Sequence, residues 1–489
     1  MPRRAAHLAL LAGAVAIAVP ARADTLRDAL AEAYRTNPTL QASRAQQRAT
    51  DEGVPIERAA GLPQVDASAQ YIEFLKQNAT AFTAPERAIN AGVDLGVPIY
   101  SGGAVRNAVR AAEERVQAGR ADLRGTESAI FSQVVAAYMD VLRGQALVAL
   151  SANQVEVLAV NVQATSDRFE IGDLTRTDVA QSQARLALAQ GDLRTAQSNL
   201  ISARENYIAL VGSFPENLEP PPPLPGLPAS PEAAVAIALE DNPDLIASRE
   251  RADAAGYDID VAGAGRLPRV SVFTGYDYQN FLGTLGGNIG TSVAQTATAA
   301  QAGVQVSIPL FQGGRPAALQ RQAQARSAAA LETVIAAERD VIAQTRAAYA
   351  SWQAASAIIQ SSQTAVSAAE LSLEGVRAEN SIGNRTILDV LNAEQELLSA
   401  RVQLVTARRN AYVAGFSLLA AMGRAEARDL GLGEEGLLYD PTLNYDRVRG
   451  IIWDWQRDPD PMAQATRTVD IPAPDASIPA PSNDVTPSR

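Results

Sequence analysis

The chain repeats its own design, and this internal duplication constrains the fold more than any other feature of its 489 residues. The segment "ALAEAYRTNPTLQASR" at 29–44 aligns with "AVAIALEDNPDLIASR" at 234–249, an offset of 205 residues. Further along, "GVPIYSGG" at 96–103 aligns with "SIPLFQGG" at 307–314, an offset of 211 residues. Self-similarity at a nearly fixed offset is the signature of a repeated structural unit. The sequence therefore predicts two similar halves, the second of which gains six residues between these two blocks.

Each half contains alternating stretches that predict one β-hairpin, over 64–100 in the first half and over 270–311 in the second. The first strand alternates polar residues with the apolar Val65, Ala67, Ala69 and Tyr71. This is the period of a strand with one apolar face. Loops are expected at 75–90 and 280–301, and the six additional residues of the second half are predicted to lie in its loop.

Two segments of 67 residues, 104–170 and 315–381, are predicted to be long helices of about 100 Å, because an α-helix rises 1.5 Å per residue. The second segment shows a seven-residue rhythm at positions such as Val334, Val341 and Ala348, which is typical of a coiled-coil seam. Many of the residues in this rhythm are small. Such seams indicate helices packed side by side along their length.

The other helical segments are about half as long, roughly 55 Å each. Return segments follow the sharp turns at 175–211 and 386–422, and leading segments precede the hairpins at 25–60 and 231–266. One return segment and one leading segment, placed end to end, match one long helix. The sequence therefore predicts a rod with the hairpins at one end, the turns at the other and helix junctions near the middle.

These elements divide the chain into five parts. Residues 1–23 have the charged start, apolar core and Ala-Arg-Ala end of a secretory signal peptide. The first repeat is 24–213, a Pro-rich linker at 214–230 is expected at the waist of the rod, and the second repeat is 231–424. The tail, 425–489, is rich in Pro and Asp and is expected to be largely disordered. Trp453 and Trp455 are expected to fasten its start to the rod.

Composition argues against enzymes and nucleic-acid binders. There is no cysteine, the single histidine, His7, lies in the predicted signal, and Lys76 is the only lysine. We therefore predict no catalytic residue, no metal ligand, no cofactor and no nucleotide site. The formal net charge of −12 disfavours contact with nucleic acid.

The four predicted strands are long enough to cross a bilayer when tilted, but four strands cannot close a barrel. Since open edges are not tolerated in hydrocarbon, the chain must oligomerise, with two copies giving eight strands and three giving twelve. Aromatic residues near the strand ends are expected to form interfacial girdles: Tyr71, Phe74, Tyr100, Tyr276, Tyr278, Phe281 and Phe311. A soluble β-subdomain remains the alternative.

The duplicated order of helix with "NP", two strands, long helix, "IG" turn and shorter helix resembles the TolC-type outer-membrane channel-tunnel family, over residues 24–424. "IGNRTILDVLNAEQEL" at 382–397 is the most specific segment. The resemblance implies a homotrimer in the cell outer membrane, a transmembrane β-barrel of four strands per chain above a long antiparallel α-helical coiled-coil barrel. It implies export of small toxic compounds or proteins, as the exit duct of a tripartite efflux pump or a type I secretion system. The implied partners are a periplasmic adaptor and an inner-membrane pump or ABC transporter. The alternative is a periplasmic or surface coiled-coil scaffold without a pore.

The most conspicuous motif occurs twice, as "FEIGDLTRTDV" at 169–179 and "ENSIGNRTILDV" at 379–390. In each copy a glycine can end one helix in the left-handed conformation, and a threonine can cap the next helix together with an aspartate three residues on. The residues that carry these roles are Gly172, Thr175 and Asp178, and Gly383, Thr386 and Asp389.

The resemblance also implies roles for these turns at a periplasmic mouth. Asp178 and Arg385 match positions that hold the tip closed, and a ring of three Asp389 carboxylates would attract cations. Asn380 and Asn392 depart from a tyrosine and an acid in the family pattern, so a weaker gate is expected. The turn residues Gly172, Thr175, Gly383 and Thr386 are expected to contact the adaptor.

Overall fold

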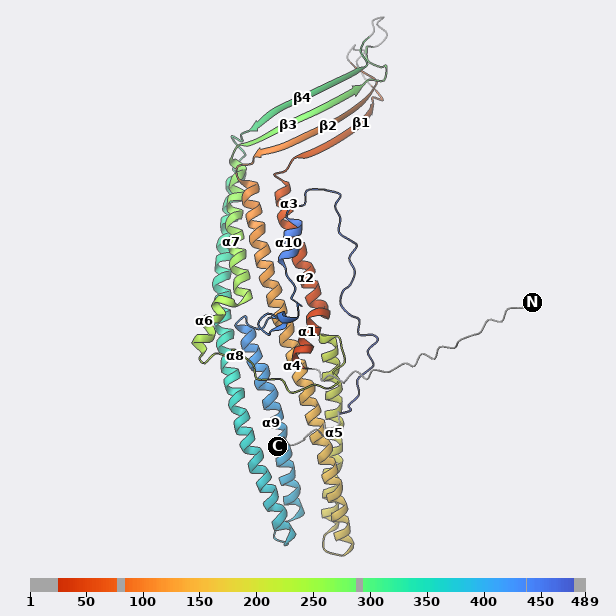
Figure 1. The fold of residues 1–489 in the computed structure, drawn as a ribbon, viewed down its shortest axis with the longest axis vertical. Helices are drawn as coiled ribbons and strands as arrows, with labels where there is room; N and C mark the ends of the chain where they lie inside the picture. The colour runs from red at the N-terminus through yellow and green to blue at the C-terminus, as the bar shows by residue number, and fades with distance from the viewer. Residues whose placement is uncertain (1–24, 77–83, 287–292, 437, 479–489) are drawn as a thin grey trace, which may run out of the picture.

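The protein is a long helical rod that carries a β-sheet at one end (Figure 1). The computed structural model describes residues 25–76, 84–286, 293–436 and 438–478, so the predicted signal peptide lies outside the described residues. The two long helices, α4 (Ala104–Glu170) and α8 (Arg315–Ser381), have the predicted bounds and 67 residues each.

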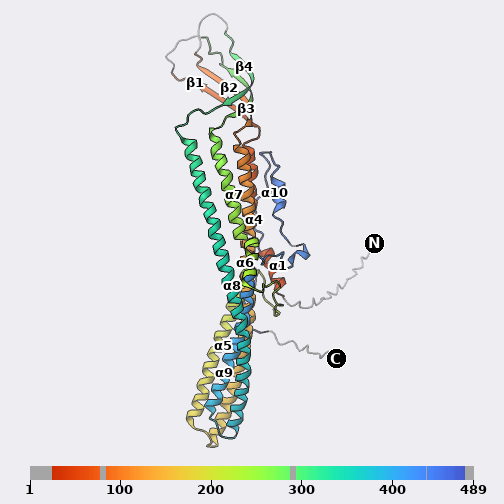
Figure 2. The ribbon, with the colours of Figure 1, turned by 90° about the vertical axis from the view of Figure 1, so that its left-hand side faces the viewer.

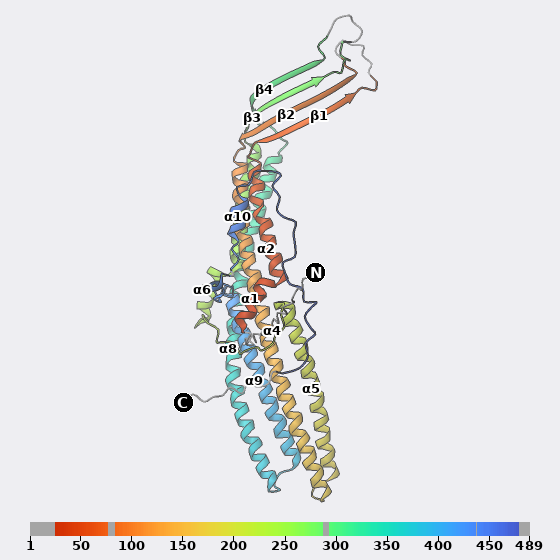
Figure 3. The same cartoon turned by 45° about the vertical axis from the view of Figure 1, so that its right-hand side comes forward.

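Shorter helices complete the rod around α4 and α8. The return helices α5 (Arg176–Val211) and α9 (Ile387–Ala421) lie in the half away from the sheet, where the order across the rod is α8, α9, α4, α5 (Figure 3). In the half nearest the sheet, α7 lies between α8 and α4 (Figure 2). α2 and α3 lie against the other side of α4 (Figure 1). The short helices are α1 (Leu26–Thr36), α2 (Pro38–Asp51), α3 (Gly53–Ala59), α6 (Pro231–Asp241), α7 (Pro243–Gly263) and α10 (Thr442–Val448). In both halves of the rod, α8 lies at one edge of the helical layer.

An Asn-Pro pair in each half joins the leading helices to the return helix. The side-chain oxygen of Asn37 caps α2, while its amide nitrogen donates to the carbonyl oxygen of Leu210 at 2.9 Å. Asn242 caps α7 and donates to the carbonyl oxygen of Ala421 at 3.0 Å. A proline disfavours helical backbone at the residue before it, so α1 and α6 end at these asparagines. A return helix and the leading helices thus stack end to end, although each leading segment is broken rather than continuous.

The four strands form one antiparallel sheet in the order β1, β2, β3, β4. Their bounds are β1 (Gln64–Glu73), β2 (Arg87–Tyr100), β3 (Arg269–Asn280) and β4 (Thr296–Ser307). Within the described residues, β1 and β4 are the two edges of this sheet. One face is apolar yet uncovered, since Val65 and Val304 are 67% and 65% exposed. An apolar sheet face of this kind indicates contact with lipid or with another protein.

The strand register shows where the second half gains its six residues. Gln64 pairs with Gly96, and their equivalents Arg269 and Ser307 pair in the second hairpin. From these positions β1 and β2 pair over ten residues, whereas β3 and β4 pair over twelve. Each added pair takes one residue from each strand, so four of the six residues lengthen the strands and only two lengthen the loop. The prediction that the whole difference lies in the loop is therefore wrong.

The predicted aromatic girdles occupy both ends of the sheet. Six of the seven residues lie at one end or the other. Those near the hairpin loops are Tyr71, Phe74, Tyr278 and Phe281, and those near the helices are Tyr100 and Phe311. Tyr276 instead pairs with Val93 away from the strand ends, so its assignment to a girdle is wrong. Alternation places a side chain on a face but does not fix its height in the sheet, which depends on the register.

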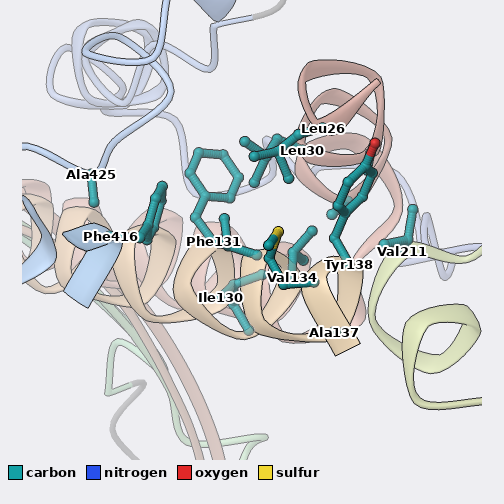
Figure 4. Packing of buried hydrophobic residues seen from close by; sticks show 14 of the residues in the cluster. Leu26, Leu30, Ile130, Phe131, Val134, Ala137, Tyr138, Val211, Phe416 and Ala425 are labelled. Carbon is teal, nitrogen blue, oxygen red and sulfur yellow. The ribbon is translucent and has the colours of Figure 1, made fainter. Parts of the chain in front are cut away.

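The largest buried cluster lies at the waist, where α1, α4, α5 and α9 meet (Figure 4). Tyr34 packs against Phe131 with ring centroids 6.0 Å apart, and Tyr138 packs against Tyr207 at 6.4 Å. Among the described helices, α4 alone is apolar enough over a sufficient length to cross a membrane, but 44% of that stretch is buried inside the protein.

The Pro-rich linker crosses the waist between α5 and α6 (Figure 1). The hydroxyl of Tyr138 donates to the carbonyl oxygen of Glu219 at 2.7 Å. Tyr349, which is the equivalent residue of the second half, donates to the carbonyl oxygen of Ala229 at 3.0 Å. The duplicated tyrosines therefore fasten both ends of the linker to the two long helices.

The described part of the tail contacts the rod at several places. Its first part joins the core at the waist through Ala425, Ala427 and Leu432. Further along, the backbone N–H of Tyr439 donates to the hydroxyl of Tyr34 at 3.0 Å, and Asn444 donates to Asp51 at 2.8 Å. The expectation that 425–489 is largely disordered stays a prediction, and these contacts hold parts of its described segment against the rod. Composition indicates how much apolar surface a segment carries, but it does not reveal which polar groups on the rod the segment will bond.

The far end of the tail is held by an arginine rather than by the tryptophans. Trp453 and Trp455 are 67% and 84% exposed, so they do not fasten the tail. Arg204 of α5 is only 2% exposed and donates to the carbonyl oxygens of Asp475 and Ser477 at 2.6 and 2.7 Å. Burial lowers the pKa of Arg204, and the neighbouring Asp475 carboxylate opposes that shift.

Replacing Arg204 by methionine should release the end of the tail. Hydrogen bonds from a charged donor contribute about 1.5–3 kcal/mol, so the released state should become at least about tenfold more populated. We expect correspondingly faster trypsin cleavage after Arg467 in limited proteolysis. Arg194→Met is the matched control, because Arg194 lies on the same helix, is exposed and bonds only to Gln197. Equal cleavage rates in the two variants would contradict the role of Arg204.

Candidate functional site: the paired turns at the helical end

Two helix reversals end the rod on the side away from the sheet (Figure 1). Gly172 and Gly383 both have φ of 84°, a left-handed conformation that favours glycine. In the first reversal the N–H of Asp173 donates to the carbonyl oxygen of Arg168 at 2.9 Å, and the second reversal repeats this bond at the same distance. Such bonds close a Schellman motif. The duplicated "IG" sequences therefore build the same reversal twice.

A capping box follows each reversal. The N–H of Asp178 donates to the side chain of Thr175 at 3.3 Å, and the N–H of Thr175 donates back to the Asp178 carboxylate at 2.9 Å. Thr386 and Asp389 repeat both bonds, at 3.3 and 3.0 Å. Bonds from the threonine side chain, and then from its backbone, hold the pKa values of Asp178 and Asp389 below the ordinary range. Both carboxylates are therefore charged at neutral pH, and both residues are partly exposed to solvent.

The structure brings Arg385 to an acid within its own turn. Its Nε lies 2.7 Å from Glu379, a bond that raises the pKa of the guanidinium. Asn380 donates to the carbonyl oxygen of Arg385 at 2.7 Å. The bonds of Asp178 stay inside its capping box, so no ion pair joins it to Arg385 in the described part of the chain. The expected link between these two residues stays a prediction.

Two polar bridges connect the helices of the two halves above the turns. Arg185 of α5 donates to Asn392 of α9 at 3.0 Å. Glu394 of α9, which is 4% exposed, accepts from Asn161 of α4 at 3.0 and 3.1 Å and from Arg377 of α8 at 3.0 Å. Helices α4, α8 and α9 thus meet at one buried carboxylate.

Sequence reasoning singled out Asn392 but missed Glu394. A signal was present, because Glu394 follows the buried Leu391 by three residues and precedes the buried Leu397 by three, the spacing of an apolar helix face. An acid at such a position is buried and must find partners. What the sequence could not show is that these partners come from α4 and α8.

The arrangement at this end of the rod provides connections between helices and fixed charge. Two reversals present fixed negative charge, while one buried contact at Glu394 and one exposed bond between Arg185 and Asn392 connect the helix pairs α4–α5 and α8–α9. Within the described ranges, no three Asp, Glu or His side chains gather closely enough to hold a metal ion. Loosening these contacts would let the helix pairs α4–α5 and α8–α9 separate at the turns.

Comparison with known proteins agrees with this architecture. The family model described as "Outer membrane efflux protein" matches residues 29–213 and 234–424, which correspond to the two halves of the duplication. The chain is 34% identical over 451 residues to the outer membrane efflux protein BepC of Brucella suis, covering 92% of this chain and 96% of the relative. It is 26% identical to the outer membrane protein TolC of Vibrio cholerae, covering 83% and 92%.

A solved structure shows the same fold. The outer membrane channel CmeC of Campylobacter jejuni superposes with a TM-score of 0.72 at 17% identity, covering 87% of this chain and 89% of that one. The duplicated helices, the four-stranded sheet and the sequence matches to both halves lead to one conclusion. The chain belongs to the outer membrane efflux protein family.

Proposed function

We propose that three copies of this chain close into one channel across the outer membrane, and that this channel is the passive exit duct of an efflux system for small toxic compounds. The observation that carries the proposal is the sheet at the end of the rod. It has four strands, an uncovered apolar face and two free edges in the described chain. Lipid can cover such a face, but only neighbouring strands can satisfy the edges. Three copies would supply twelve strands.

The helices support the same closure. α4 and α8 have equal lengths and equivalent positions in the duplication, yet α4 buries 20 residues and α8 only 7. α8 continues from the edge strand β4, so the free edges of the helical layer and of the sheet lie on the same side. A neighbouring copy that packs against β4 would therefore also cover α8.

Cysteine cross-linking tests the closure, since the chain has no cysteine of its own. Ser68 on β1 and Ala299 on β4 belong to the same row across the sheet. Pairs of cysteines at and around these edge positions should give a covalent trimer that conducts ions in planar bilayers, while single cysteines should not. A water-soluble monomer without ion current would contradict the duct and favour a coiled-coil scaffold.

The cargo and partners are separate parts of the proposal. BepC is named an outer membrane efflux protein, and we propose efflux of small compounds as the role of this chain, so deletion of the gene should increase dye retention. Loss of secreted proteins instead would indicate protein secretion. We expect an inner-membrane pump and a periplasmic adaptor to supply energy and contact. The adaptor should cross-link to Thr175 and Thr386 beside Gly172 and Gly383, and failure at both turns would remove them from the contact.

Arg385→Ser tests the proposed gate. If the arginines help to hold the mouth closed against Asp178 of a neighbouring copy, their loss should raise the single-channel conductance. Arg401→Ser is the matched control, because Arg401 pairs with Glu370 at 2.8 Å in a comparably exposed bridge away from the turn. Unchanged conductance in Arg385→Ser would leave this residue with only its local contact to Glu379.

Asp389→Asn tests the proposed ring of charge. Removing the carboxylate should lower the preference for cations and weaken block by trivalent cations, measured as a shift in reversal potential. Because the pKa of Asp389 lies below its ordinary value, the unaltered channel should keep its preference down to about pH 4 and lose it at lower pH. The stabilisation from the capping box is likewise present above the ordinary pKa and is lost as the pH falls through the lowered one. An unaltered reversal potential would remove Asp389 from ion selection.

A further inference from the structure

A cavity of about 670 Å³ lies at the waist, between the long helices and the Pro-rich linker. Its size is within the range of about 300–1,000 Å³ that is typical of small-molecule sites. α4, α8 and α9 form its walls, and the linker contributes five residues: Pro220, Pro221, Pro223, Leu224 and Leu227. This place is distant from both the sheet and the turns, so the export function does not account for it.

The apolar side of the cavity is built around Trp352. Tyr349 holds the indole edge to face, with ring centroids 5.6 Å apart, and is itself bonded to the linker. Gly415 lets the indole and Leu224 pack closely, because a Cβ there would lie 3.2 Å from Trp352 and 2.8 Å from Leu224. The indole is therefore held in place by both neighbours. Such preorganised aromatic surface is typical of small-molecule sites.

The polar side of the cavity carries an excess of positive charge. Arg143, Arg408 and Arg409 line it, and no acidic residue does. Asp140 pairs with Arg409 at 2.8 Å and with Arg143 at 3.3 Å, so one carboxylate is shared by two guanidinium groups. Arg408 has no ion-pair partner in the described part of the chain. On a chain with a net charge of −12, this local excess attracts anions.

Two donors at the cavity lack protein acceptors. The Nε of Arg143 is buried and has no hydrogen-bond partner among the described residues. The hydroxyl of Tyr412 is also without a partner in those residues, and burial raises its pKa to about 12, so it stays protonated. A buried donor without an acceptor costs free energy, and an anionic ligand would satisfy the Nε of Arg143. The partly buried hydroxyl of Tyr412 could donate a second bond to the same ligand.

We propose that this cavity binds an amphipathic organic anion of small-molecule size, with its apolar body against Trp352 and Leu224 and its anionic group at Arg143, Arg408 and Tyr412. The proposal goes beyond export and does not depend on it. A channel that conducts normally could lack this site, and a failed export assay would not remove it.

Trp352 provides the measurement. Only three tryptophans are present, and Trp453 and Trp455 are exposed, so replacing both by phenylalanine leaves Trp352 as the sole reporter. The full chain, purified into phosphatidylcholine nanodiscs, is titrated with 11-bromoundecanoate, whose bromine quenches tryptophan fluorescence on contact. We expect saturable quenching. The uncharged 11-bromoundecanol should bind at least about tenfold more weakly, as loss of one charge-assisted contact requires.

Two variants with matched controls test the anionic end of the site. Arg408→Ala and Ser356→Glu, which puts an acid on the lining, should each weaken binding at least about tenfold. Arg401 and Ser361 lie on the same helices outside the lining of the cavity. The control variants Arg401→Ala and Ser361→Glu should therefore bind 11-bromoundecanoate as the parent protein does. Absence of saturable quenching, equal binding of the alcohol, or equal binding in all four variants would overturn the proposal. A change in Trp352 emission only on adding an adaptor protein would also overturn it, and would indicate a protein contact instead.

Discussion

Alanine at position 423 should lower the unfolding temperature of the purified protein more than alanine at any other turn glycine. Gly423 has φ of 73°, where a side chain costs about 1–2 kcal/mol. A Cβ would also lie 2.3 Å from the carbonyl oxygen of Asp241. This neighbour is backbone at the junction of α6 and α7, so the junction itself must move. We expect a total cost of about 3–5 kcal/mol, measured by thermal denaturation.

Two other glycines with positive φ separate the clash from the backbone conformation. Gly383 has φ of 84° but open space around its Cβ position, so Gly383→Ala should show only the conformational cost. Gly212 is the duplicate of Gly423, and a Cβ there would meet the side chains of Thr36 and Thr466 at 3.1 and 3.0 Å. Since side chains can move more easily than backbone, Gly212→Ala should fall between the other two. Equal shifts at all three positions would show that the junction is not a close contact.

Glu394→Ala should loosen the helical end of the rod and raise the single-channel conductance. The carboxylate is buried and bonds to Asn161 and Arg377, so its removal breaks the bridge between α4, α8 and α9. Breaking a buried pair costs about 3–5 kcal/mol, but the half-exposed side chain of Arg377 can be solvated, which reduces our expected cost to about 2 kcal/mol. This corresponds to roughly a thirtyfold change in the equilibrium between joined and separated helix pairs, α4–α5 and α8–α9.

Glu370→Ala is the control for Glu394→Ala. Glu370 pairs with Arg401 at 2.8 Å, but both side chains are 40–49% exposed and the bridge joins only α8 with α9. Exposed pairs of this kind contribute at most about 1 kcal/mol. Conductance and thermal stability should therefore change little. If the two variants behave alike, burial at the three-helix contact is not what holds the hairpins together.

Much of the helical architecture could be predicted because its signals are local or repeated. The predicted segments 104–170 and 315–381 match the bounds of α4 and α8, and the seven-residue rhythm of the second segment indicated a long packed helix. The capping boxes at Thr175 and Thr386 follow from residues three positions apart. The duplication then doubled the weight of every local signal, since each assignment in one half could be checked against the other.

The errors concern contacts between segments far apart in the chain. Composition predicts a disordered tail because the segment offers little apolar surface, and it does not reveal the contact with Arg204, 271 residues before Asp475. The six additional residues were placed in a loop because alternation does not reveal how many pairs a hairpin forms. Glu394 was missed because its partners lie on two other helices.

The sequence by itself determined the periodicities of this protein: two halves, two long helices, two identical reversals and four alternating strands. The tertiary structure alone decided which surfaces those elements share, including the fastening of the tail, the three-helix contact at Glu394 and the cavity beneath the linker. The physical reason is the distance along the chain over which each interaction acts. Helix caps, turns and alternation depend on neighbours a few residues apart, whereas the partner of a buried charge or an apolar face is chosen by the packing of the whole rod.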